Sequence, residues 1–277
     1  ISGTRNFSSD ASYGFIGGQP NMVTGNGIPA QVENLFIAKT ANTDNITMSN
    51  PNLAVKNRMV FISGNIATGA NNLQLGINAT NKGTLEHTSG FVKGEMTRWF
   101  NGANSGNNSS LFPLGTIDNK NRFAKIEFAS TSAGTLTASM NSTAMGILGV
   151  SAISAIPAAG TCASFSVVST DEFYWNMIPN GISGNYSASF TKESISTDLI
   201  CEMTLLKRDA TDWIASGTHI EPTGTSSMVT LSRSGLTGFQ DFGFGNKRCG
   251  ATNTWNGTAW TGGTPTASQK IIFAGNY

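Results

Sequence analysis

The sequence carries little charge. Charged residues make up 12% of its 277 residues, about half of the roughly 25% found in typical soluble proteins. Aromatic and β-branched residues are nevertheless plentiful, so the chain does not combine the low hydrophobicity and high net charge of a disordered protein. Its polar surface must therefore be built from Asn, Ser, Thr and Gly, and such a surface suits an extracellular β-protein.

A basic cluster and a long apolar run are also missing. The net charge is +1 and no basic run exceeds two residues, whereas nucleic-acid binding usually needs clustered basic residues. The longest apolar candidate, residues 144–159, is interrupted by Gly146, Gly149 and Pro157. It falls short of the roughly 18 continuous residues that a membrane helix needs. We therefore expect no nucleic-acid partner and no membrane-spanning segment.

Cysteine is scarce as well, with only Cys162, Cys201 and Cys249. These residues are too few and too widely spaced for a zinc site, which typically shows paired C-x₂₋₄-C ligands. One disulfide with a spare thiol would fit an oxidising compartment. Three reduced, buried cysteines are the alternative, and the sequence leaves the pairing open.

Alternating side chains predict β-strands along most of the chain. Ala124, Ile126 and Phe128 alternate with charged residues, which is the period of a strand with two different faces. Residues 91–140 as a whole read as an antiparallel β unit, with Gly, Pro, Asn and Asp in the gaps where turns need them.

Residues 32–75 show short apolar pairs whose members are separated by one residue. The pairs are Leu35/Ile37, Ile46/Met48, Leu53/Val55, Met59/Phe61 and Leu73/Leu75. Strands this short, with turn residues between them, can stack as the faces of a parallel β-solenoid, although an antiparallel meander would use similar spacings. We favour the solenoid, with Asn71 and Asn72 beside a strand end, where Asn tolerates a left-handed corner.

Short strand patterns with turns between them continue after residue 160 and favour a β-sandwich. Residues 199–206 are apolar at both odd and even positions, which predicts a central strand with both faces buried. The best helical candidate, residues 144–156, is weakened by its Gly and Ser residues. The predicted fold class is therefore all-β, a parallel β-solenoid-like stack followed by an antiparallel β-sandwich. The predicted boundaries are residues 1–90 for the solenoid-like region, 91–250 for the sandwich, and 251–277 for a closing strand or the start of a following module.

Several short segments occur in an order that resembles a known family. They are residues 28–37, 69–76, 90–98, 112–116, 234–245 and 254–260, with Phe-Pro-Leu-Gly-Thr at 112–116 and Gly-Phe-Gln-Asp-Phe-Gly at 238–243 among them. Together they resemble the repeated module of very large surface proteins of the Bacteroidota that are exported by the type IX secretion system. The shared order extends over most of the chain, although each segment is short and rich in glycine.

The resemblance implies an extracellular or cell-surface setting and a structural role. In that family the modules serve as adhesin, stalk or filament material, and no catalytic set belongs to this module. The C-terminal residues resemble the opening of a further module, which implies that repeats continue beyond Tyr277. The implied partners are neighbouring copies or modules of the same protein, with surface glycans as a second candidate.

Few residues suggest chemistry. His219 and Glu221 would share one strand face and could hold a metal, but no third ligand is identifiable, so a solvated strand face is the better interpretation for them. His87 lies in a loop-like stretch. The segment from Asp118 to Asn121 is too sparse for a calcium loop and predicts a turn. We expect no metal site and no cofactor.

Three carboxylates are candidates for a polysaccharide-active enzyme. Asp171 and Glu172 lie beside an aromatic run, and Asp241 lies between two phenylalanines. A glycosidase needs two carboxylates flanking the sugar, but isolated acids at strand ends are common and the sequence does not bring these together. We therefore expect no catalytic residues.

Tryptophan is the remaining candidate for recognition, because an exposed indole can stack on a sugar ring. Trp255 and Trp260, in a Gly/Thr/Asn context, are the two expected to be partly exposed as glycan or interface contacts, whereas tryptophan more often fills a core. The favoured hypothesis is a non-catalytic structural or adhesive module. The alternatives are a carbohydrate-binding module and, less favoured, the polysaccharide-active enzyme.

Overall fold

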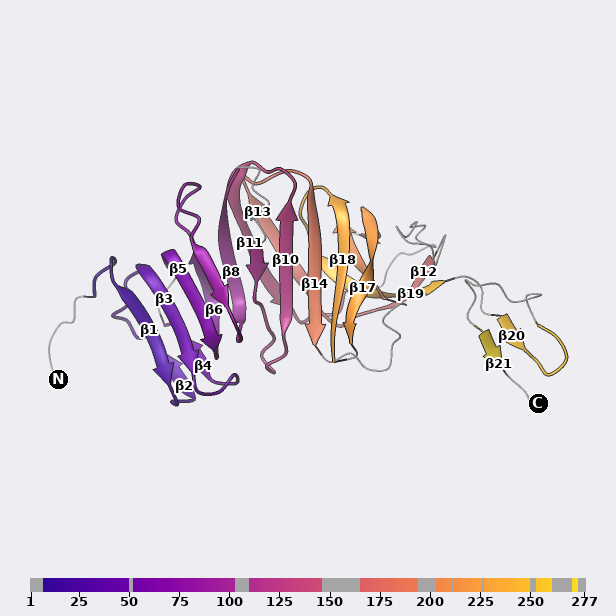
Figure 1. The fold of residues 1–277 in the computed structure, drawn as a ribbon, viewed down its shortest axis with the longest axis horizontal. Helices are drawn as coiled ribbons and strands as arrows, with labels where there is room; N and C mark the ends of the chain where they lie inside the picture. The colour runs from indigo at the N-terminus through magenta and orange to yellow at the C-terminus, as the bar shows by residue number, and fades with distance from the viewer. Residues whose placement is uncertain are drawn as a thin grey trace.

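The computed structural model describes residues 7–49, 52–102, 110–145, 165–193, 203–210, 212–225, 227–249, 253–260 and 271–273. All regular structure within these residues is β, which confirms the predicted fold class. The molecule is elongated, and its strands run across the long axis (Figure 1).

The N-terminal part forms a parallel β-solenoid of about four turns. Its first face stacks β1 (Ser12–Gly17), β3 (Gln31–Lys39), the second half of β5 (Leu53–Ser63) and β7 (Thr84–His87). Its second face stacks β2 (Asn21–Val23), β4 (Asn45–Thr47), the start of β6 (Asn65–Leu75) and the start of β8 (Val92–Asn101). The third face joins the first half of β5 to the ends of β6 and β8. Each coil therefore turns three corners.

The apolar pairs predicted from the sequence are the inward-facing residues of this solenoid. Leu35 is in register with Met59 of the next coil, and Ile46 is in register with Ile66. These four side chains are fully buried. Burial of one such side chain is worth about 1.5–3 kcal/mol, so the aligned apolar ladders stabilise the stack of coils.

The solenoid corner near Asn71 and Asn72 differs from the prediction. Both residues belong to β6, and neither has a positive φ; the left-handed residue is Gly69, with φ 62°. Glycine takes this conformation without a Cβ clash. Asn72 instead donates its side-chain amide to Thr97 Oγ1 at 2.7 Å, which links neighbouring coils on the third face.

Asn65 is a polar residue inside the solenoid and is fully buried. Its Oδ1 accepts the Phe91 N–H at 3.1 Å. Its Nδ2 donates to the Asn42 carbonyl at 2.8 Å and to Asn119 Oδ1 at 3.1 Å. One side chain thus ties together segments from successive coils and satisfies backbone groups that the corner leaves without strand partners.

Strand β8 joins the solenoid to the second half of the molecule. One edge of β8 pairs in parallel with β6, and its other edge pairs antiparallel with β11 (Ala133–Asn141). The same sheet continues from β11 through β13 (Tyr174–Asn180), β19 (Phe242–Cys249), β15 (Met203–Asp209) and β16 (Asp212–Ile214), with β12 (Phe165–Thr170) also paired to β19. One sheet therefore runs through both halves, and β15 lies inside it rather than at its edge.

A second, antiparallel sheet covers the later part of the first. Its order is β17 (Thr218–Thr225), β18 (Met228–Leu236), β14 (Tyr186–Glu193), β10 (Arg122–Phe128) and β9 (Ser110–Phe112). Figure 1 shows β10, β14 and β18 in front of β11, β13 and β19. Contacts between the two inner faces make this half a β-sandwich, as predicted. A small parallel pair of β20 (Asn253–Trp255) and β21 (Ile271–Phe273) lies at the C-terminal end.

The sandwich core is built around aromatic rings. Trp175 on β13 is fully buried, and its ring centroid lies 4.9 Å from that of Phe190 on the opposite sheet and 5.1 Å from that of Phe244. Its indole N–H donates to the Arg122 carbonyl at 2.9 Å. Trp175 therefore contributes both apolar area and a satisfied polar contact between the sheets.

Arg233 links the two sheets through hydrogen bonds. It lies on β18 and is fully buried. Its Nε donates to the Leu205 carbonyl of β15 at 2.6 Å, and its Nη2 donates to Thr204 Oγ1 at 2.9 Å. Nη1 donates to the Ser216 and Gly217 carbonyls, each at 3.2 Å. Burial lowers the pKa of Arg233 to about 10, so the guanidinium is charged at neutral pH.

Some predicted features fall on residues whose structure is not described. These are Cys162, Cys201 and most of the helical candidate at 144–156. Cys249 ends β19, but its side chain is not among those described. The cysteine pairing therefore stays open.

We predict that Asn65→Ala will destabilise the solenoid. The substitution leaves the buried Phe91 N–H and the Asn42 carbonyl without their partner, which costs about 1–3 kcal/mol. Urea denaturation followed by circular dichroism will measure the loss. Asn185→Ala, at an exposed asparagine, is the matched control and should change stability by less than about 0.5 kcal/mol. Equal stability of both variants would contradict the role given to Asn65.

We predict that Arg233→Lys will lower the free energy of unfolding by about 2–4 kcal/mol, although it keeps the charge. Lysine has one ammonium group and cannot reach the four acceptors that the planar guanidinium bonds, so buried acceptors lose charge-assisted hydrogen bonds. Chemical denaturation is the measurement. Lys125→Arg, a swap at a partly exposed position of β10, is the control, and wild-type stability of Arg233→Lys would refute the prediction.

Candidate functional site

The first coil of the solenoid presents strand edges at one end of the molecule. Among the described residues, β1 pairs only with β3 and β2 pairs only with β4. Two apolar side chains project from these edge strands: Ile16 is 69% exposed and Val23 is 63% exposed. An edge strand has backbone N–H and C=O groups available for a further strand, so this end can pair with another polypeptide.

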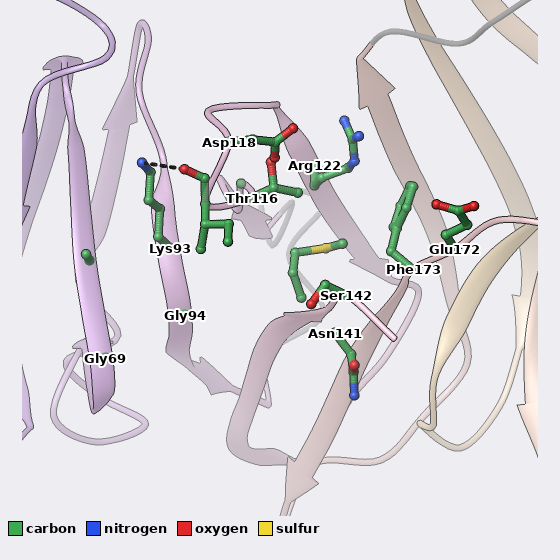
Figure 2. Close-up of a pocket in the computed structure, with 14 residues that line it drawn as sticks. Gly69, Lys93, Gly94, Thr116, Asp118, Arg122, Asn141, Ser142, Glu172 and Phe173 are labelled. Atoms are coloured by element: carbon green, nitrogen blue, oxygen red, sulfur yellow. Dashed lines mark hydrogen bonds between the residues drawn. The ribbon is translucent and has the colours of Figure 1, made fainter. Parts of the chain in front are cut away.

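A cavity of about 550 Å³ lies where the solenoid meets the sandwich. Figure 2 shows Lys93, Gly69 and Gly94 on its solenoid side and Glu172 and Phe173 on its sandwich side. The remaining lining residues come from the turn after β9, the start of β10, the end of β11 and β6: Gly115, Thr116, Ile117, Asp118, Arg122, Met140, Asn141, Ser142 and Ala67. Its volume lies in the range of small-molecule sites, roughly 300–1,000 Å³.

The solenoid wall of the cavity is a bulge in β6. The pairing of β6 with β8 shifts between Ala67 and Asn72, so residues 68–71 face only Gly94. Thr68 compensates for the interrupted backbone pairing, because its Oγ1 accepts the Glu95 N–H at 3.0 Å. Gly94 has φ 125°, and a Cβ there would lie 2.0 Å from Thr68 Oγ1. Glycine is therefore required for this close approach.

The sandwich wall carries a cation–π cluster. The Arg122 guanidinium carbon lies 4.6 Å from the Phe173 ring centroid, and Lys192 Nζ lies 5.3 Å from it. Arg122 is 7% exposed and donates to the Asn121 and Glu193 carbonyls at 2.7 and 3.0 Å. Burial lowers its pKa, while nearby carboxylates oppose that shift. This cluster fixes Phe173 at the cavity edge.

The turn over the cavity is held by its own hydrogen bonds. Asn119, with φ 63°, accepts from Lys93 Nζ at 2.7 Å, and the predicted turn closes with the Thr116 N–H donating to the Lys120 carbonyl at 3.0 Å. The Thr116 side chain lowers the pKa of Asp118 by hydrogen bonding, and burial lowers the pKa of Lys93. A lowered pKa keeps the Asp118 carboxylate charged at neutral pH.

The three carboxylates considered for catalysis are not brought into one site. Asp171 forms an ion pair with Lys192 at 2.7 Å. Asp241 accepts from Asn176 Nδ2 at 2.6 Å and from Arg208 at 3.1 Å. Of the three, Glu172 alone lines the cavity. Asp171 and Asp241 therefore serve as hydrogen-bonded structural acids in the sandwich.

The two histidines lie in different environments. His87 Nε2–H donates to the Gly90 carbonyl at 2.7 Å, and the His87 ring lies edge-on to the Phe123 ring, with the ring centroids 5.2 Å apart. His219 is 1% exposed, with Nδ1 3.4 Å from Thr204 Oγ1. The prediction of a solvated face for His219 was wrong, because its side chain points between the two sheets. No group of three potential metal ligands occurs among the described residues.

The structure brings Trp255 and Trp260 together on one tight turn. Their ring centroids are 5.3 Å apart and their backbones form an antiparallel bridge. Asn256 Oδ1 closes the turn by accepting the Thr258 and Ala259 N–H groups at 3.0 and 2.9 Å. Both rings are partly exposed. Their role as a glycan or interface contact stays a prediction.

The sequence pattern gave no signal for the cavity itself. Lys93, Arg122 and Phe173 belong to separate strands or loops, and each looks ordinary in its own segment. A long-range pairing such as that of β8 with β11 brings the segments together, and no local motif records such a pairing.

Comparison with protein-family models, curated proteins and solved structures finds no match to this chain. Within the part of the chain that the structure describes, no helix is long and apolar enough to cross a membrane.

We predict that His87 makes stability depend on pH. Burial lowers its pKa in the folded state, below the ordinary value of about 6.5. The unfolded chain therefore takes up this proton first, so stability is full above pH about 6.5 and is lost as pH falls through the folded pKa. Denaturant titrations between pH 7.5 and about 5 will show a smaller loss for His87→Gln than for wild type. Parallel pH profiles for the two proteins would contradict the prediction.

Proposed function

We propose that this chain is a non-catalytic structural and adhesive module of an extracellular surface protein or filament. The observation that carries the proposal is the first described coil, whose strands β1 and β2 each leave one edge unpaired among the described residues, at one end of an elongated molecule. Solenoid ends usually need a polar cap to stay soluble and unpaired. Exposed Ile16 and Val23 do not provide one.

The partner in this proposal is a neighbouring copy or module of the same protein. Backbone groups on a strand edge pair with any compatible strand, and the apolar side chains beside them add buried area when they do. The net charge of +1 leaves little electrostatic repulsion between copies. End-to-end contacts of this kind would give a stiff, extended assembly.

The chemistry of the acids supports a role without catalysis. Asp171 and Asp241 are occupied by Lys192, Arg208 and Asn176, which suits structural carboxylates better than a general acid and base. The cell-surface setting rests on the resemblance to type IX-exported modules and on the Asn/Ser/Thr/Gly surface, and it is part of the proposal.

We predict that the purified chain associates end to end as its concentration rises, and that Ile16→Lys with Val23→Lys abolishes the association. A lysine beside an edge strand blocks strand addition, because pairing would bury its charge. Sedimentation velocity and negative-stain microscopy will report particle mass and length.

The control is Ile178→Lys, which changes an isoleucine that is 52% exposed on β13, away from the first coil. It should associate as wild type does. The proposal would be contradicted if the wild-type chain remained a compact monomer at every concentration.

A further inference from the structure

The junction cavity has polar groups that the fold does not use. Among the described residues, the Glu172 carboxylate and the Ser142 hydroxyl make no hydrogen bond to another residue, and both side chains are exposed. Both residues line the cavity. Only water bonds these two groups in the free protein, and the hydroxyl groups of a bound molecule can replace that water.

The charges around the cavity cancel. Lys93 and Arg122 supply two positive charges, and Asp118 and Glu172 supply two negative ones. Lys93 is already bonded to Asn119 and, at 3.4 Å, to the Ile117 carbonyl, which Figure 2 shows as a dashed line. An anionic ligand would face both carboxylates, and a cationic ligand would face both cations. A neutral ligand rich in hydroxyl groups meets no such repulsion.

The cavity also offers apolar surface between its polar groups. Phe173, Met140 and Ile117 line it, and Ile117 is 89% exposed at the turn that overhangs it. A pyranose ring presents C–H groups on its faces and hydroxyls around its edge, so it can cover Ile117 while its hydroxyls bond Glu172 and Ser142. From this combination we infer that the junction cavity binds a neutral saccharide.

The walls are fixed before any ligand enters. On the sandwich side, Asn141 Nδ2 donates to the Tyr174 hydroxyl at 2.7 Å, and Asn141 Oδ1 accepts the Thr143 N–H at 2.9 Å. On the solenoid side, the Thr68–Glu95 bond holds the bulge. A preformed site avoids the entropy of ordering side chains during binding.

This site is separate from the end-to-end contact and from the Trp255–Trp260 turn. Its residues belong to β6, β8, the 115–118 turn, the start of β10, the end of β11 and the segment just before β13, whereas the proposed assembly surface is the edge of β1 and β2. A module that binds a saccharide at the junction cavity and another copy of the chain at its end could attach to a glycan while it polymerises. Failure of one activity leaves the other intact.

Isothermal titration calorimetry with a panel of oligosaccharides tests the inference. The neutral probes are cellotriose, maltotriose and diacetylchitobiose, and digalacturonic acid is the anionic probe. We expect at least one neutral probe to bind and digalacturonic acid not to bind. Glu172→Gln and Ser142→Ala should each weaken the neutral probe, roughly tenfold for Glu172→Gln because a charge-assisted hydrogen bond is lost.

Glu127→Gln is the matched control, since Glu127 is an exposed carboxylate on β10 outside the cavity, and it should bind as wild type does. Circular dichroism confirms that the variants are folded. The inference is overturned if no neutral probe binds, if digalacturonic acid alone binds, or if binding survives in both cavity variants. Loss of binding in Trp255→Ala with the cavity variants unaffected would place the sugar at the turn instead, and would overturn it as well.

Discussion

The pairing of β8 is the constraint on which the architecture depends. This strand must offer one edge to a parallel neighbour and the other to an antiparallel one, so it sets the register of the solenoid and of the sandwich at once. Any slip of β8 by one residue would turn buried Met96 and Phe100 outward. The predicted boundary at residues 90 and 91 stays a prediction, but backbone hydrogen bonding is continuous across it.

Buried arginines carry a second part of the design. Arg98, Arg122 and Arg233 are each at most 9% exposed, and Arg98 on β8 donates to the Leu111 carbonyl of the opposite sheet at 2.9 Å. These cations bond mainly to carbonyls rather than to carboxylates. A planar group with five donors suits such positions, where carbonyl groups of two sheets converge. Three of the few charged side chains are therefore buried, and the surface carries even less charge than the composition suggests.

Sequence reasoning recovered the fold where side chains follow a local period. The pairs Leu35/Ile37 and Met59/Phe61 predicted inward ladders because each coil repeats the same inside–outside pattern. It failed where distant strands decide the environment, as for His219 on β17, which the sequence placed in solvent and the first sheet covers through Thr204 of β15. The cavity was out of reach for the same reason, since Lys93 and Phe173 meet only through tertiary structure.

The direction of the strands has a mechanical consequence. They lie across the long axis (Figure 1), so tension between the two ends acts along the inter-strand hydrogen bonds rather than along the backbones. Hydrogen bonds that are loaded along their own direction break one after another. In strands that are pulled parallel to their backbones, the bonds break together. Among the described pairings of the long sheet, β13 and β19 share a single residue pair, Trp175 with Phe242. Under load, the sheet would start to open at that seam, and the chain would yield gradually while it lengthens.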